Sequence, residues 1–379
     1  MGAGPSGSHT AGRLAALGYK VIVIEEHAQA GKTTCCTGIV GKECIDTFSV
    51  DPEVILRESA SATFFSPSEK SIRMEKDSVQ AYIVDRHAFD ASLAMKAQEH
   101  GADYLWKSRI NRVSPRCDSI QVEVESSKIT IEGKILVIAS GFNSRLTEKV
   151  GLGKVGDFAV GAQAEVEVEG IDEVEVYFGR QIAPGFFAWL VPTSHGKALI
   201  GLLSRRSPGT YLRELMSTLQ AKDKIACNDA KISYGGIPLK PLSRTYRERI
   251  VVVGDAAGQI KPTTGGGIYY GLICADKAVD TLHHALSTGN FSDKTFAGYE
   301  RAWKERLSGD LRAGCRARWL FEHLSDRRID RTFTILESRG IHQALLDSPD
   351  FSFDWHRNLI MKGLRQLGAR GVLQMLRPF

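Results

Sequence analysis

The sequence opens Met1-Gly2-Ala3-Gly4-Pro5-Ser6-Gly7, in which three glycines follow the spacing G-x-G-x-x-G. A helical pattern follows over residues 8–17, and residues 19–25 have the pattern of a buried strand ending in acid. Such glycines let the backbone approach a pyrophosphate, and a helix beginning there directs its N-terminus at the phosphates. Glu25 stands where a carboxylate accepts hydrogen bonds from ribose hydroxyls. The pattern predicts a Rossmann-like dinucleotide site, with Gly2, Gly4, Gly7 and Glu25 as cofactor-binding residues.

A second glycine-rich stretch follows residues 250–253, which have the pattern of another buried strand. Gly254-Asp255-Ala256-Ala257-Gly258 closes this strand, and Pro262 and Gly265-Gly266-Gly267 precede a helical pattern over residues 269–285. Backbone N–H groups at a helix start stabilise negative charge, which would suit a reduced flavin. A helix-capping aspartate beside a flexible loop is the simpler interpretation of the same residues.

Four stretches resemble the geranylgeranyl reductase family of para-hydroxybenzoate-hydroxylase-type flavoproteins. Residues 261–272, Lys-Pro-Thr-Thr-Gly-Gly-Gly-Ile-Tyr-Tyr-Gly-Leu, resemble that family's flavin-ring segment. Cys36-Thr37-Gly38 resembles its C-x-G turn, Arg86 its arginine at a helix start, and Phe187-x-Trp189-x-Val191-Pro192 its Y-x-W-x-F-P motif. The resemblance implies FAD as the cofactor, and it adds Arg86, Gly254, Asp255, Pro262, Gly265, Gly266 and Gly267 to the residues expected to bind it. It implies Cys36 as a catalytic residue and Phe187, Trp189 and Pro192 as substrate-binding residues.

The implied activity is an FAD-dependent reduction of carbon-carbon double bonds in a geranylgeranyl or polyprenyl lipid. An FAD-dependent monooxygenase or halogenase-like enzyme is the alternative. A non-enzymatic flavin-binding module, for electron transfer or associated with a membrane, is a third interpretation. The halogenase W-x-W-x-I-P motif has Phe187 in place of its first tryptophan here, and we identify no counterpart of the catalytic lysine. Flavin hydroxylases carry an alanine-aspartate-glycine segment where this chain has Ala139-Ser140-Gly141, so Ser140 replaces the aspartate. Its loss weakens the hydroxylase interpretation and leaves the electron donor, a ferredoxin or NAD(P)H, open.

Individual residues also have plainer interpretations. A tryptophan on a strand is commonly a core aromatic, and a lone cysteine is commonly a small buried hydrophobe. Arg86 could pair with Asp85 or Asp90 instead of binding a cofactor. Phe187 and Val191 replace the family's tyrosine and phenylalanine, which removes a hydroxyl and a ring from the implied substrate pocket.

Composition is that of a globular protein with two or three domains: 379 residues, 43% hydrophobic and 25% charged. No apolar run reaches the roughly 18 to 20 residues of a membrane span. The seven cysteines form no C-x-x-C pair, so we expect neither a metal site nor disulfides. We therefore expect a cytoplasmic location. Residues 301–379 hold 15 Lys/Arg against 9 Asp/Glu, a balance of +6, whereas the whole chain totals +5. This basic excess comes without a nucleic-acid recognition motif, so no nucleic-acid partner is expected.

We expect an α/β fold with a Rossmann-like FAD-binding domain, a β-rich substrate domain and a helical C-terminal region. The FAD-binding domain would comprise residues 1–61, 84–157 and 246–291, the substrate domain residues 62–83 and 158–245, and the helical region residues 292–379. Residues 357–379 have an amphipathic basic pattern that could contact the inner face of a membrane. Resembling flavoproteins carry a buried strand before the first glycine, so we also expect the natural chain to begin upstream of Met1.

Overall fold

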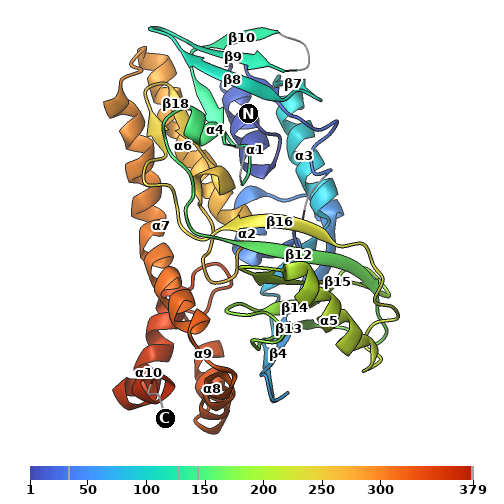
Figure 1. Ribbon diagram of the computed structural model, residues 1–379. Coiled ribbons are helices and arrows are strands. Elements are labelled where there is room, and N and C mark those ends of the chain that lie inside the picture. The colour runs from blue at the N-terminus through green and yellow to red at the C-terminus, as the bar shows by residue number, and fades with distance from the viewer. Residues whose placement is uncertain (33–34, 126–128, 143–144, 377–379) are drawn as a thin grey trace. The chain divides into compact units, whose positions relative to one another are not determined.

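The computed structural model describes residues 1–32, 35–125, 129–142 and 145–376, with side chains up to residue 368 (Figure 1). The chain has the expected mixed α/β fold and divides into two compact units, each made of three segments. Unit 1 comprises residues 1–34, 86–158 and 237–311, and unit 2 comprises residues 35–85, 159–236 and 312–379.

Three helices form the frame of unit 1: α1 (Pro5–Ala16), α3 (Arg86–Glu99) and α6 (Ile268–Thr288). Helix α1 packs against both α3 and α6. The α1–α3 contact needs a glycine, because a Cβ at Gly12 would lie 3.2 Å from the Cα of Ala97. Helices α1 and α6 were expected from the helical patterns over residues 8–17 and 269–285 and are confirmed.

Short parallel strands in unit 1 lead to the glycine-rich turns. Strand β1 (Ile22–Ile24) pairs with β7 (Asp103–Leu105), and β11 (Leu136–Ile138) pairs with β18 (Ile250–Val252). Met1 and Gly2 lie between these two pairs: the Gly2 N–H donates to the Ile24 carbonyl at 2.9 Å, and the Met1 amino group donates to the Val137 carbonyl at 2.8 Å. The remaining elements are β8 (Ile110–Pro115), β9 (Ile120–Val124), β10 (Thr130–Gly133), α4 (Leu146–Lys149), β17 (Tyr246–Arg247) and the 3-10 turn η2 (Gly254–Ala257).

The largest sheet belongs to unit 2 and has the strand order β16-β12-β15-β14-β13-β4-β5. Its strands are β4 (Ser61–Phe65), β5 (Ser71–Glu75), β12 (Phe158–Glu167), β13 (Val174–Tyr177), β14 (Ala188–Pro192), β15 (Lys197–Ser204) and β16 (Ser233–Pro238). Helix α5 (Pro208–Gln220) covers one face, where Leu212 and Met216 pack with Leu190 and Ile200. Because side chains alternate along a strand, Trp189 and Val191 lie on the other face.

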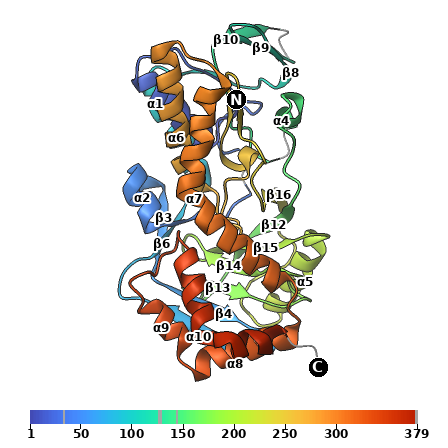
Figure 2. The ribbon, with the colours of Figure 1, turned by 90° about the vertical axis from the view of Figure 1, so that its left-hand side faces the viewer.

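A smaller sheet of unit 2 has the order β2-β6-β3 and comprises β2 (Ile39–Gly41), β6 (Ala81–Val84) and β3 (Ile55–Ser59). Near it in sequence lie helix α2 (Lys42–Phe48) and the 3-10 turn η1 (Pro52–Val54). Helix α7 (Asp293–Glu322) contributes its last residues to unit 2, and α8 (Asp326–Ser338), α9 (Ile341–Leu346) and α10 (Arg357–Leu376) follow (Figure 2).

The C-terminal helix α10 is interrupted at Gly368, whose backbone is not helical (φ 64°, ψ 169°). Before this point, Leu367 is buried and packs with Ile341 of α9. The expected amphipathic helix over residues 357–379 therefore has a packed first part. Residues 377–379 lie outside the described residues.

Candidate functional site

The three glycines of the first motif play different parts in the turn before α1. A Cβ at Gly2 would lie 2.3 Å from the Ala139 carbonyl oxygen, and one at Gly7 would lie 2.1 Å from the Gly2 carbonyl oxygen. Gly4 has no atom within 4 Å of its Cβ position, and it is the N-cap of α1, which no side chain of the described residues caps. Gly2 and Gly7 therefore permit the turn to close, whereas the Cβ position of Gly4 faces open space.

Glu25 follows β1, and its carboxylate faces the glycine-rich turn. The Ala3 N–H donates to Glu25 Oε2 at 2.8 Å, and the His27 N–H donates to Oε1 at 2.9 Å. Nδ1 of His27 lies 2.6 Å from the same Oε1 atom. The neighbouring Glu26 is exposed. These contacts fix a carboxylate at the strand end, where a ribose would need an acceptor.

Asp255 and Arg86 meet in unit 1 from separate segments. The Arg86 guanidinium donates to Asp90 at 2.9 and 3.1 Å, which is the pairing that the plainer interpretation anticipated. Asp255 lies in η2 and is partly buried. Burial raises the pKa of Asp255, and the positive charge of Arg86 opposes that rise. Arg86 therefore pairs with Asp90 at the start of α3 and acts on Asp255 through its charge.

The triple glycine packs Asp255 against the beginning of α6. A Cβ at Gly267 would lie 2.6 Å from Asp255 Oδ1, and one at Gly266 would lie 2.8 Å from Cε of Lys261. Gly267 is the N-cap of α6, which no described side chain caps, and Pro262 is buried in the same turn. Gly254 has a different role, because its φ of +66° and the closeness of Ser6 Oγ, 2.7 Å from its Cβ position, make it a packing glycine.

These residues of unit 1 fit FAD. The open Gly4 and the uncapped α1 suit a pyrophosphate, Glu25 suits a ribose, and a partly buried Asp255 beside an uncapped α6 suits ribityl hydroxyls and the flavin ring. The arrangement combines two helix N-termini with two carboxylates, so it matches a ligand that carries both phosphates and hydroxyl groups.

The C-x-G turn belongs to unit 2. The Gly38 N–H donates to Cys36 Sγ at 3.4 Å, and Nε2 of Gln163 donates to the Cys36 carbonyl at 3.2 Å. The thiol of Cys35 points elsewhere and donates to the Ser233 carbonyl at 3.8 Å. Gln163 was not singled out in the sequence, where it is one polar residue in an alternating strand. The two neighbouring cysteines are therefore held by different partners.

An aromatic face covers the side of the large sheet opposite α5. We define it as Phe64, Phe178, Phe187, Trp189, Phe321 and Phe333, all in unit 2. Phe178 is its centre, with ring centroids 6.4 Å from Phe187, 5.4 Å from Phe321 and 6.0 Å from Phe333. The Phe187 and Trp189 rings lie 5.9 Å apart. Two of the expected substrate residues therefore meet in one aromatic layer, to which the C-terminal helices also contribute.

The third expected substrate residue lies elsewhere. Pro192 pairs with Ala198 in the register of β14 and β15, and Ala198 belongs to the core under α5. Alternation along β14 thus places Pro192 on the face opposite Phe187 and Trp189. Phe321 and Phe333 were missed in the sequence because no local pattern relates them to the strand motif.

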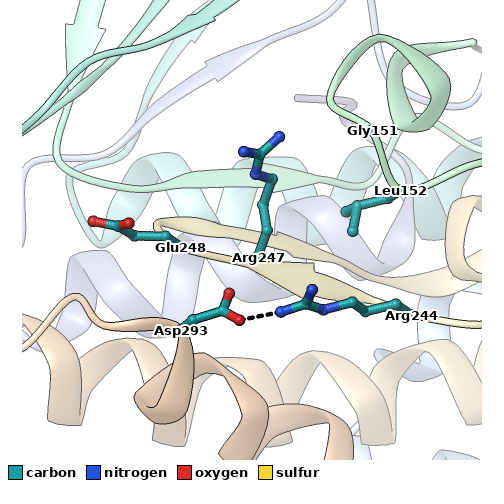
Figure 3. A pocket seen from close by; sticks show the side chains of 6 residues that line it. All are labelled: Gly151, Leu152, Arg244, Arg247, Glu248 and Asp293. Carbon is teal, nitrogen blue, oxygen red and sulfur yellow. Dashed lines mark hydrogen bonds and ion pairs between the residues drawn. The ribbon is translucent and has the colours of Figure 1, made fainter.

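Unit 1 also has an open hollow of about 400 Å³, lined by Gly151, Leu152, Arg244, Arg247, Glu248 and Asp293 (Figure 3). Arg244 is ion-paired with Asp293, and Arg247 donates to the Val150 carbonyl at 2.6 Å. The hollow contains none of the residues expected to bind FAD, and its two arginines are matched by two acids. Over the described part of the chain, no helix is long and apolar enough to cross a membrane.

Two curated reductases are similar to this chain over most of its length. The chain is 32% identical to the digeranylgeranylglycerophospholipid reductase of Methanocaldococcus jannaschii, over 87% of this chain and 88% of the relative. It is 29% identical to digeranylgeranylglycerophospholipid reductase 2 of Methanothermobacter thermautotrophicus, over 90% and 91% of the two chains.

Solved structures show the same fold. A geranylgeranyl bacteriochlorophyll reductase-like protein from Thermoplasma acidophilum superposes with a TM-score of 0.86 at 24% identity, over 99% of this chain and 96% of the other. A flavin-dependent brominase superposes with a TM-score of 0.72 at 15% identity, over 99% and 96%. The model of the family described as tryptophan halogenase matches residues 49–312. The chain thus belongs to the geranylgeranyl reductase family of FAD-dependent oxidoreductases.

Proposed function

We propose that this protein uses FAD to hydrogenate carbon-carbon double bonds of a geranylgeranyl or related polyprenyl lipid. The aromatic face carries the proposal, because a prenyl chain offers only apolar surface and double bonds for recognition. Phe178, Phe187 and Trp189 provide a wall of that chemistry on the large sheet. The names of the relatives, which are reductases of a digeranylgeranyl lipid, support the substrate class.

The addition to the alkene requires a hydride and a proton. Reduced FAD, held by the glycine-rich turns, Glu25 and Asp255, would supply the hydride for one alkene carbon. We assign the proton to the Cys36 thiol: its S–H bond breaks as a C–H bond forms on the second carbon, and solvent then reprotonates the thiolate. An unactivated alkene has no carbonyl to accept negative charge, so positive charge develops on carbon. The face of the Trp189 ring is suited to stabilise that charge.

Two electrons must be returned for each double bond reduced. A ferredoxin would supply them singly and NAD(P)H as a hydride, and both balance the reaction. The protein would meet its lipid substrate as a peripheral protein at the inner face of the membrane.

Reoxidation of the reduced holoprotein tests the function. Photoreduced protein is mixed, without oxygen, with a geranylgeranyl lipid or with the same lipid bearing saturated chains, and the flavin absorbance is followed. Return of the oxidised spectrum with the unsaturated lipid alone is the expected result, together with a product heavier by two hydrogens. Identical traces for both lipids would exclude the alkene as the electron acceptor.

A halogenase or monooxygenase is the second candidate, favoured by the tryptophan halogenase family match. Mixing the same reduced protein with oxygen distinguishes it. A long-lived oxygen adduct of the flavin, combined with no response to the prenyl lipid, would support this candidate over the reductase.

The role of Cys36 has its own test. Cys36→Ser should bind FAD normally but reoxidise with prenyl lipid about 10² to 10⁴ times more slowly, which is the usual value of a positioned acid. Cys35→Ser is the matched control and should be much milder, because its thiol contacts the Ser233 carbonyl. Equal single-turnover rates for Cys36→Ser and the wild type would assign the proton to water or another group.

A further inference from the structure

Three neighbouring strands of the large sheet place Gln163 and Trp189 on one face. In the register, Gln163 of β12 stands opposite Gly201 of β15, and Gly201 stands opposite Trp189 of β14. Residues directly opposite each other in a sheet point to the same face. Gln163 and Trp189 are therefore second neighbours across the sheet, with a residue that has no side chain between them.

The glycine allows the indole to cover the middle strand. A Cβ at Gly201 would lie 2.5 Å from Cζ2 and 2.7 Å from Cε2 of Trp189. The indole ring therefore occupies the space above β15, and its Cε2–Cζ2 edge lies over Gly201. Gly201 thus lets the indole extend from β14 over β15, the strand that pairs with the strand of Gln163.

Both residues have a buried polar atom with no protein partner among the described residues: Gln163 Oε1 and Trp189 Nε1. Gln163 is only 5% exposed. Its amide orientation is fixed, because Nε2 must be the atom that donates to the Cys36 carbonyl at 3.2 Å. Buried polar atoms in native proteins almost always have a partner, which is commonly an ordered water. One atom is an acceptor and the other a donor, so a single hydroxyl group satisfies both.

We propose that Gln163 Oε1 and Trp189 Nε1 form a one-oxygen subsite that binds a water molecule, and that Gln163 is a positioning residue joining this water to the Cys36 turn. The water accepts from the indole N–H and donates to the amide oxygen. The other end of the same amide holds the Cys36 carbonyl. The subsite thus places one polar group in an otherwise apolar face, beside the residue that we assign as the proton donor. Its importance for the reduction rests on the proposed function, whereas its existence does not.

A double-mutant cycle on the reactivity of Cys36 tests the subsite without any prenyl substrate. In FAD-loaded protein carrying Cys35→Ser, the alkylation rate of Cys36 by iodoacetamide is read by peptide mass spectrometry. Gln163→Met removes both amide contacts at similar size, and Trp189→Phe removes the indole N–H but keeps an aromatic ring. Phe187→Leu is the control, because it alters the same aromatic face without touching either polar atom.

Each single variant should raise the alkylation rate by about threefold or more, and the double variant should match the larger single effect, because both act through one bound molecule. Effects that multiply in the double variant, or a Gln163→Met rate equal to that of the parent, would overturn the proposal. So would a Phe187→Leu effect as large as that of Trp189→Phe.

A second variant covers the case in which Gln163→Met does not fold, judged by thermal unfolding. Gln163→Glu keeps an acceptor oxygen for the water but cannot donate to the Cys36 carbonyl, so it should release the turn. Trp189→Phe should then have no additional effect on alkylation, and an undiminished effect would contradict the link through Gln163. Loss of prenyl-dependent reoxidation with an intact cycle would reject the proposed function and leave the subsite standing.

Discussion

Gly38 lies so close to the end of β6 that a Cβ added to it would stand 2.2 Å from the carbonyl oxygen of Val84. The Val84 N–H donates to the Gly38 carbonyl at 3.0 Å, and Gly38 has a φ of +72°. The glycine of the C-x-G turn is therefore required by a backbone contact as well as by its left-handed conformation. The position of Cys36 depends on this contact, because the turn begins there.

Gly38→Ala should consequently lower the free energy of unfolding by about 3 kcal/mol or more, since the strained φ and the displaced Val84 carbonyl both contribute. Gly18→Ala is a matched control: its φ is +83°, but no atom lies within 4 Å of its Cβ position. It should cost only about 1 kcal/mol, the penalty of the left-handed conformation. Urea unfolding of both variants gives the comparison, and equal losses would show that the Val84 contact is unimportant.

The glycines of the first motif should separate cofactor binding from folding. Gly4→Ala should unfold at nearly the wild-type temperature but bind FAD about tenfold or more weakly, because the added methyl group enters the open space before α1. Gly7→Ala should mainly lose stability, because its Cβ would strike the Gly2 carbonyl. Flavin fluorescence titration and thermal unfolding of both variants measure the two effects. FAD binding at wild-type strength by a folded Gly4→Ala protein would place the pyrophosphate elsewhere.

Features encoded locally could be predicted from the sequence. The glycine-rich turn, α1 and Glu25 lie within one short segment, where spacing alone defines the geometry. Residues 35–85 form one compact unit with residues 159–236 because β4 pairs with β13, a long-range pairing that no local pattern indicates.

The candidate substrate site was harder to predict from the sequence, because it also depends on long-range pairing. Trp189 was found through its motif, but Gln163 and Gly201 join it only through the register of three strands. Phe321 and Phe333 reach the aromatic face from C-terminal helices that the sequence left without a role. The side of the sheet on which Pro192 lies likewise could not be predicted without the strand register. Alternation assigns side chains to the two faces only when the limits of the strand are known.

The pH dependence of the FAD-free protein should reveal Asp255. Burial raises its folded-state pKa above the unfolded value, so the carboxyl contributes its full stability below the unfolded pKa and loses it as the pH rises through the folded pKa. Asp255→Asn should therefore be more stable than the wild type at neutral pH and similar to it near pH 3 to 4, while binding FAD more weakly. Asp172→Asn, at an 88% exposed side chain, is the control. Parallel stability curves for wild type and Asp255→Asn would contradict this expectation.

Helix α10 offers the clearest place to test membrane contact. Met361 and Leu364 are 44% and 36% exposed, and Lys362 and Arg365 lie among them. Deleting residues 357–379 would also remove the Leu367 packing with Ile341, so charge reversal is the sharper change. Lys362→Glu with Arg365→Glu should weaken co-sedimentation with anionic vesicles about tenfold or more, because each basic residue near such a surface contributes about 1 kcal/mol. Lys20→Glu with Lys154→Glu makes the same charge change at two exposed lysines elsewhere and should bind as the wild type does. High salt should abolish the difference, and equal binding to neutral and anionic vesicles by all three proteins would rule out an electrostatic contact through α10.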